Sequence, residues 1–247
     1  MSRSVTRRSL LGAALAAPAV ARAFGDASRF IPAVAQHGGT WDLRASGLRR
    51  LAWELQRRTS VEVVLEARAT PLDSPKLFEL PFLYLSSDRE LPAFTPAQTE
   101  NLRRYLTFGG FVFADANDGS AGTGFDASFR RELAKVLPQV QPRPLPATHV
   151  VFKTFFLLDT APGRLLNVAQ LDAWTIGKRA AVIYSQNDVM GALARDESGS
   201  YEFEVTPGGE RQREYATRLA INIAMYALCL DYKDDGVHIL EIMRRRR

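Results

Sequence analysis

The chain has 247 residues, of which 46% are hydrophobic and 24% charged, so its length and composition fit one folded domain and exclude a disordered chain. The net charge is +5, but four basic residues lie in the first 23 positions and four more in the run 244–247. The body between these segments is therefore slightly acidic, and we expect no nucleic-acid partner.

The first 23 residues have the three parts of a removable export signal. Arg7 and Arg8 precede a mild apolar run at 10–21, and Ala21 and Ala23 form an A-x-A cleavage site. Paired arginines before a weakly hydrophobic run are typical of the twin-arginine route, and the run is too short to cross a bilayer as a helix. We expect export to the periplasm.

We therefore expect a twin-arginine signal peptide at 1–23, a single α/β domain at 24–240 and a basic tail at 241–247. The tail is either a solvated end or an anion-binding device. Within the domain, short apolar runs alternate with segments of helical period, which predicts a mainly parallel sheet covered by helices. In the first part of the domain, the predicted strands are 30–36, 61–65 and 80–85, and 43–57 is a predicted helix with one apolar face.

The next helix has clear signals at both ends. Thr95 suits the N-cap, Pro96 the first helical position, and Gln98 completes a capping box. The glycines at 109–110 end the helix. A second strand and helix unit follows, with a strand at 111–114, a glycine-rich loop at 115–124 and a helix whose apolar residues recur from 125 to 137.

The last part of the domain contains a proline-rich stretch at 138–146, which leads through His149 into the apolar run 150–156. Residues 180–184 are predicted as a buried strand. Residues 201–205 alternate between apolar and acidic side chains, which predicts a half-exposed strand at a sheet edge. Arg218 interrupts the long apolar helix predicted at 210–230, so we expect it to be buried in the fold and the mature chain to have no transmembrane span.

Several of these segments together resemble the bacterial family called domain of unknown function 4159, namely 80–85, 101–106, 109–115, 125–133, 181–185, Asn222 and 231–238. The resemblance covers nearly the whole mature chain. It implies an α/β fold of three layers with a mainly parallel sheet flanked by helices, similar to the flavodoxin-like and class I glutamine amidotransferase-like architectures. It implies a protein partner in the cell envelope, because some relatives are fused to membrane segments, but it implies no particular reaction. Where the family often has proline after histidine, this chain has Val150 after His149, so no rigid turn is implied there.

Polar side chains follow four of the predicted strands, where ligands bind in open α/β sheets. If these strand ends are adjacent, the side chains form a polar rim that suits a polar ligand or a hard cation. The alternative is that each residue caps its own turn or helix. The candidate ligand-binding residues are His37, Asp88, Arg89, Asp115, Asn117, Asp118, Asn187 and Asp188.

The sequence lacks the motifs of nucleophilic catalysis. Cys229 is predicted to be a core residue of the last helix, and Asp118 stands where a G-x-S-x-G elbow around Ser120 needs glycine. His149 has a better claim to a functional role than His238, which we expect to be structural. No dinucleotide, phosphate-loop or haem motif is present, so we expect no cofactor.

Two functions therefore remain open. The first is a non-catalytic exported module that binds a polar ligand or a protein partner through the rim. The second is a hydrolase, with or without a metal, that uses Asp88, Asp115 or Asp188 together with His37. An ordered metal or clustered carboxylates with perturbed pKa values would favour the second function. Scattered acids, each bonded to its own backbone, would favour the first function or a purely structural role.

Overall fold

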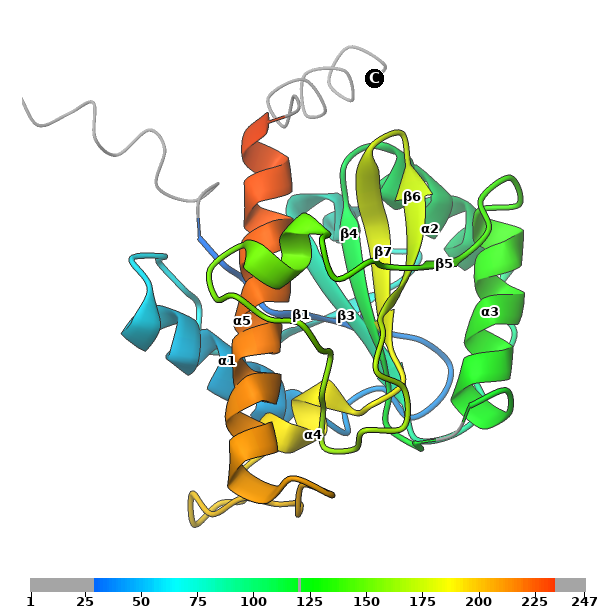
Figure 1. The fold of residues 1–247 in the computed structure, drawn as a ribbon. Coiled ribbons are helices and arrows are strands. Elements are labelled where there is room, and N and C mark those ends of the chain that lie inside the picture. The colour runs from blue at the N-terminus through cyan, green and yellow to red at the C-terminus, as the bar shows by residue number, and fades with distance from the viewer. Residues whose placement is uncertain (1–28, 120, 234–247) are drawn as a thin grey trace, which may run out of the picture.

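The computed structural model describes residues 29–119 and 121–233 and has an α/β fold (Figure 1). Its seven-stranded sheet is mixed and mostly parallel, with the order β2-β1-β3-β4-β7-β6-β5 and helices on both faces, which confirms the predicted fold class. The predicted signal peptide, Ser120, His238 and the arginine tail lie outside the described residues.

The first part of the fold contains three parallel strands. Its elements are β1 (Ala33–Gln36), α1 (Ala45–Arg58), β2 (Arg68–Pro71), η1 (Pro75–Glu79) and β3 (Phe82–Ser87). The strand predicted at 61–65 is wrong, because only Val63 pairs there, in an isolated bridge with Phe30. Pro32 has no N–H to donate, so regular pairing begins after it, where Ala33 lies opposite Arg68.

The helix predicted after Thr95 is confirmed as α2 (Pro96–Thr107). The Thr95 hydroxyl accepts from the Gln98 N–H at 3.2 Å, and the Gln98 side chain accepts from the Thr95 N–H at 3.0 Å, so the capping box is complete. β4 (Phe111–Ala116) and α3 (Gly124–Val136) follow, as the second strand and helix unit predicts.

The last part of the fold contains η2 (Val150–Lys153), β7 (Arg179–Ser185), α4 (Val189–Leu193) and the long helix α5 (Gly209–Lys233). The apolar pattern predicted β7 and α5 but not β5 (Arg143–Pro144) or β6 (Asp172–Ile176), which form the antiparallel edge beside β7. The strand predicted at 201–205 is wrong, since only Tyr201 forms a bridge, with Arg195.

In residues 201–205 the aromatic side chains contact arginines instead of a neighbouring strand. The Tyr201 ring lies between the guanidinium groups of Arg195 at 3.9 Å and Arg213 at 3.6 Å. The Phe203 ring lies 4.3 Å from the guanidinium of Arg44. Because these rings pack on cations rather than on a sheet, alternating apolar and acidic residues here do not make a strand.

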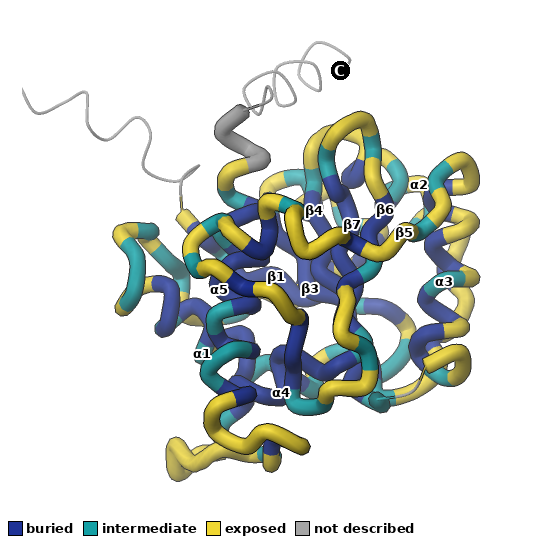
Figure 2. The backbone as a smooth tube through the Cα atoms, in the orientation of Figure 1, coloured by how far each residue is buried: buried dark blue, intermediate teal, exposed yellow. Residues whose placement is uncertain are grey.

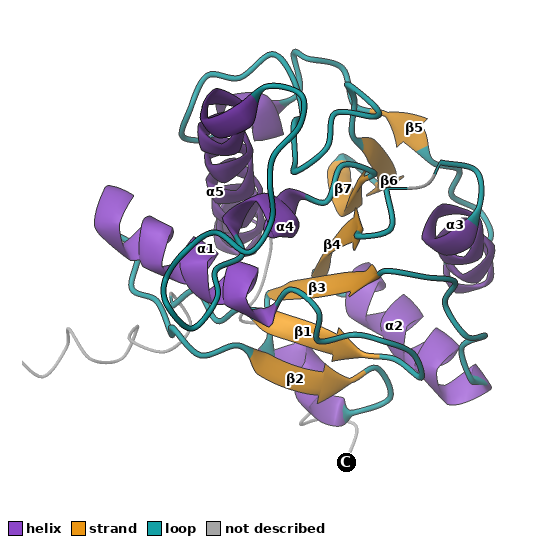
Figure 3. Ribbon diagram, turned by 90° about the horizontal axis from the view of Figure 1, so that it is seen from below, coloured by secondary structure: helices purple, strands orange, loops and turns teal. Residues whose placement is uncertain are grey.

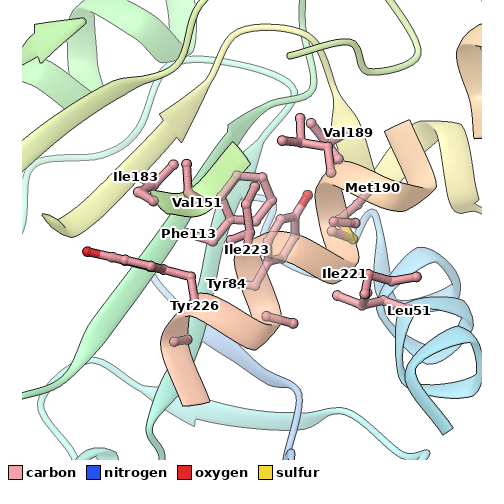
Figure 4. Packing of buried hydrophobic residues seen from close by; sticks show 14 of the residues in the cluster. Leu51, Tyr84, Phe113, Val151, Ile183, Val189, Met190, Ile221, Ile223 and Tyr226 are labelled. Atoms are coloured by element: carbon pink, nitrogen blue, oxygen red, sulfur yellow. The ribbon is translucent and has the colours of Figure 1, made fainter. Parts of the chain in front are cut away.

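The helices divide between the two faces of the sheet, as the view from below shows (Figure 3). α1, α4 and α5 cover one face, where Leu51, Phe113, Ile183 and Ile221 belong to one buried cluster (Figure 4). α2 and α3 cover the other face over a second cluster that includes Phe129. Among the described residues no helix is long and apolar enough to cross a membrane.

The parallel strands all end at one edge of the sheet, which we call the strand-end edge, and α4 begins there (Figure 1). α4 is entirely buried at this edge (Figure 2). α5 starts near the same edge and runs away from it. Cys229, near the far end of α5, is exposed, so its predicted core position is wrong. Ala227 is buried and Leu228 packs against the core, but Cys229 is exposed, so its apolar neighbours in the sequence do not bring it into the core.

Candidate functional site

Side chains from distant parts of the chain meet where β4 and β7 reach the strand-end edge. We call this group the strand-end network, and its members are Arg44, Tyr84, Asp115, Asn117, Arg164 and Asp188. Two are acids without any exposed surface, and two are arginines. Their geometry decides which of them a ligand can reach.

Asp188 is the centre of the strand-end network. Its carboxylate accepts two bonds from Arg44 at 2.9 Å each, one from Arg164 Nε at 2.5 Å and one from Asn117 Nδ2 at 3.0 Å. The Gly191 N–H adds a fifth at 3.0 Å, so Asp188 also caps α4. Its φ of 52° costs a non-glycine residue about 1 kcal/mol. The five bonds hold Asp188 in that conformation.

Asp115 lies beside Asp188 and holds the start of α4. Its carboxylate accepts from the N–H groups of Val189 at 3.0 Å and Met190 at 2.9 Å, and from the Tyr84 hydroxyl at 3.2 Å. Burial and then the nearby Asp188 carboxylate raise the pKa of Asp115 to about 7, against the opposing effect of the two N–H groups. Figure 4 shows Tyr84 beneath α5 with its hydroxyl directed towards the start of α4.

Arg164 is the most accessible charge of the strand-end network, with 22% of its side chain exposed. Only its Nε is bonded, to Asp188, so among the described residues its two terminal amino groups have no hydrogen-bond partner. Asn117 donates to Asp188 and Tyr84, whereas its buried Oδ1 has no partner there. Around the Asp188 carboxylate, the network therefore has two amino groups of Arg164 and one amide oxygen of Asn117 that make no hydrogen bond with the described residues.

The other candidate residues have separate local partners. Asn187 fastens the loop 161–168, because its Oδ1 accepts from two N–H groups of that loop and its Nδ2 donates to two of its carbonyls. Asp118 accepts from the Phe125 N–H at 2.9 Å and thereby caps α3. Asp88 pairs with its exposed neighbour Arg89 at 2.9 Å. The structure thus brings Asp115, Asn117 and Asp188 together and leaves these four apart.

His37 follows β1 at the point where the order of strands reverses, between β1 and β3. Its Nε2 lies 3.0 Å from the Ser86 carbonyl and its Nδ1 accepts from the Gly39 N–H at 3.1 Å, so both ring nitrogens are occupied. Burial lowers the pKa of His37 in spite of the Ser86 bond, which favours the neutral ring. Pro92 lies beside Gly38 and Gly39, and the His37 side chain is buried.

His149 also has a local task. Its Nδ1 accepts from the Val151 N–H at 3.2 Å and its ring packs on Tyr226, so it caps η2 against α5. Within residues 29–119 and 121–233, no cluster of three histidine, cysteine, aspartate or glutamate side chains is arranged to hold a metal ion.

Sequence reasoning missed three members of the strand-end network, namely Arg44, Tyr84 and Arg164. Tyr84 looked like one more apolar residue of a buried strand, and Arg44 like the solvated start of a helix. Arg164 lies in a loop without any pattern. The one available signal was electrostatic, since two acids buried at neighbouring strand ends need cations close by.

The fold and the strand-end network define an α/β domain with a charge-balanced polar edge. The chain belongs to the family described as Domain of unknown function (DUF4159), whose model matches residues 31–228. That span includes every element from β1 to most of α5. The chain matches no curated protein.

We predict that Asp188→Asn lowers the free energy of unfolding by about 3–5 kcal/mol, because it leaves the buried Arg44 without a counter-charge. Urea denaturation followed by circular dichroism measures the loss. The matched control is Asp88→Asn, which removes an exposed ion pair and should cost about 1 kcal/mol or less. Equal, small losses in both variants would contradict a stabilising role for the network.

We also predict a stability that depends on pH through Asp115. Its folded pKa of about 7 lies above its ordinary value of 3.8, so the folded state holds the proton more tightly. This contribution to the free energy of unfolding is present below about pH 4 and is lost as pH rises through about 7. Asp115→Asn should therefore lose less stability than the parent chain between about pH 5 and pH 8. The free energy of unfolding of both proteins is measured by urea titration at each pH. An equal change with pH in the two proteins would disprove this prediction.

Proposed function

We propose that this chain is a non-catalytic module that binds a small polar ligand at the strand-end edge, beside Arg164 and Asn117. The observation that carries the proposal is the pair of amino groups on Arg164 that have no hydrogen-bond partner among the described residues, on a side chain that is 22% exposed while its Nε is fixed on Asp188. A guanidinium held in this way presents a fork that suits a carboxylate.

The neighbouring acceptor narrows the class of ligand. Asn117 Oδ1 is buried at the end of β4 and has no partner among the described residues. Such an atom needs an N–H or O–H donor. A carboxylate with an adjacent donor, as in an amino acid or a hydroxy acid, satisfies both the arginine and the acceptor.

The clustering of Asp115 with Asp188 and the raised pKa of Asp115 favour the hydrolase alternative, but the hydrogen bonds that these side chains already make oppose it. A general base needs a free lone pair within reach of its substrate. Asp188 already accepts five hydrogen bonds and Asp115 three, and both ring nitrogens of His37 are occupied. Asp88 is bonded to Arg89 and lies outside the strand-end network.

We further propose that the chain shares the glutamine amidotransferase-like layout without its chemistry. That reaction needs a thiol on the turn after a central strand. Cys229 lies instead near the far end of α5, which runs away from the strand-end edge (Figure 1). The turn after β4 holds Asn117 and Asp118 in place of a thiol.

The proposed setting is the periplasm, with a protein partner in the cell envelope. The support is the sequence of the first 23 residues, with Arg7 and Arg8 before the apolar run and an A-x-A site after it. A protein exported by the twin-arginine route folds before transport. A domain stabilised from within by buried ion pairs, and with one cysteine only, suits that order of events.

We predict that a small carboxylate with an adjacent donor raises the thermal unfolding midpoint of the full chain by about 5 °C at saturation. The probes are malate, citrate and the common amino acids. Arg164→Lys keeps the charge beside Asp188 but loses the fork, so it should remain folded and abolish the shift. Arg89→Gln, at an exposed pair on the same edge, is the control and should keep it.

Two results would overturn this proposal. One is a panel in which no probe stabilises the parent chain, and the other is a shift that Arg164→Lys retains. Turnover of an ester or amide probe that disappears in His37→Ala would favour the hydrolase instead.

We predict that replacing Arg7 and Arg8 together by lysine blocks export in a bacterial host, because the twin-arginine route requires the arginine pair. Cell fractionation should then find the uncleaved precursor in the cytoplasm. Arg3→Lys makes the same chemical change outside the pair and should leave the mature protein in the periplasm. Unchanged export of the double variant would refute the assignment of the route.

A further inference from the structure

A polar groove lies between α1 and α5, with a volume of about 150 Å³. α1 contributes Arg50, Arg57 and Arg58, α5 contributes Arg213, and Tyr201 closes one side. None of these residues belongs to the strand-end network, so the groove is a separate feature of the surface.

The groove has an excess of positive charge. Glu54 is buried between Arg50 at 2.5 Å and Arg58 at 2.7 Å, and Arg58 also bonds to Glu214 at 2.7 Å. Arg218 binds the same Glu214 at 2.9 Å. Because Arg218 does not line the groove, the lining members of this chain balance, with two arginines against two glutamates. The third lining acid, Glu210, is neutralised by Arg213.

Arg57 adds a further cation, and it has no ion pair or hydrogen bond within the described part of the chain. It contacts the Trp53 ring, with its guanidinium carbon 5.1 Å from the ring centre. Arg50 stacks on the same ring at 3.8 Å. Arg50 lies one turn before Trp53 and Arg57 one turn after it on the same helix face, so both arginines contact its ring.

Stacking on an aromatic ring occupies the face of a guanidinium and leaves the N–H groups in its plane free to bind an anion. Arg213 also stacks on Tyr201, at 3.6 Å, but its nitrogens already donate to Glu210 and to the carbonyls of Ala192 and Phe203, so the arginines available to an anion are those of α1. The groove therefore combines surplus charge with arginines whose orientation is already fixed, which lowers the entropy cost of binding.

We propose that this groove binds a phosphate-type oxyanion. A volume of about 150 Å³ accommodates one tetrahedral group, whereas organic ligands the size of drugs need pockets of about 300 Å³ or more. The lining has four arginines against three glutamates, so a surplus of one positive charge, that of Arg57, attracts the anion. Its source is either free phosphate or a phosphate monoester on a larger molecule, and both place the same oxygens on Arg50 and Arg57.

The test is a titration of the full chain with inorganic phosphate at constant ionic strength, followed by tryptophan fluorescence. Saturable binding with a dissociation constant of about 1 mM is expected, with a signal that disappears in Trp53→Phe. Arg57→Gln should weaken binding at least about tenfold, because it removes the unpaired cation. Arg57 is exposed and forms no hydrogen bond in the described structure, so this variant should fold normally.

Arg49→Gln is the matched control, since Arg49 is an exposed arginine of the same helix whose contact with Glu66 is 3.7 Å long. It should bind phosphate as the parent chain does. A second titration with glycerol 3-phosphate distinguishes the sources, because tighter binding than inorganic phosphate indicates a monoester ligand and equal binding indicates the free ion.

Absence of saturable binding, or equal binding by Arg57→Gln and the parent chain, would overturn the proposal. Arg164→Lys should leave phosphate binding unchanged, because Arg164 lies outside the groove. The proposal for the groove and the proposal for the strand-end edge can therefore be tested independently of each other.

Discussion

Two carboxylates without access to solvent, those of Asp115 and Asp188, stand at neighbouring strand ends, and their neutralisation determines the arrangement of this edge. An unpaired charge at such depth is prohibitively unfavourable, so each acid must collect partners. Asp188 takes Arg44, Arg164 and Asn117, and Asp115 takes the first N–H groups of α4. The same bonds fix the loop that carries Arg164, the start of α1 and the position of α4 against the sheet.

This solution has a functional consequence. Both oxygens of Asp188 are used in hydrogen bonds that stabilise the fold, whereas two amino groups of Arg164 are not. The groups at this edge that can still bind a ligand are therefore cationic. An edge that reads as acidic in the sequence is therefore suited to an anionic ligand in the folded protein. The groove between α1 and α5 follows the same principle, since Glu54 is enclosed by arginines and the surplus charge belongs to Arg57.

Several elements could be predicted because local chemistry alone specifies them. The capping box of Thr95 and Gln98, the uniformly apolar β7 and the continuous apolar stripe of α5 depend on neighbouring residues only. The predicted strands at 61–65 and 201–205 failed because a strand also requires a partner. Pro32 prevents regular pairing in the first case, and arginines occupy Tyr201 and Phe203 in the second. Both obstacles come from other parts of the chain.

The sequence by itself determined the α/β class, the family resemblance and the set of polar residues at the strand ends, because periodicity and end signals are properties of short segments. Only the tertiary structure decided which of those residues meet. It joined Asp115, Asn117 and Asp188, left Asp88, Asp118 and Asn187 to local tasks, and added Arg164 from a loop without a pattern. The reason is physical, since the partner of a buried charge is chosen by distance in space, which sequence separation does not reveal.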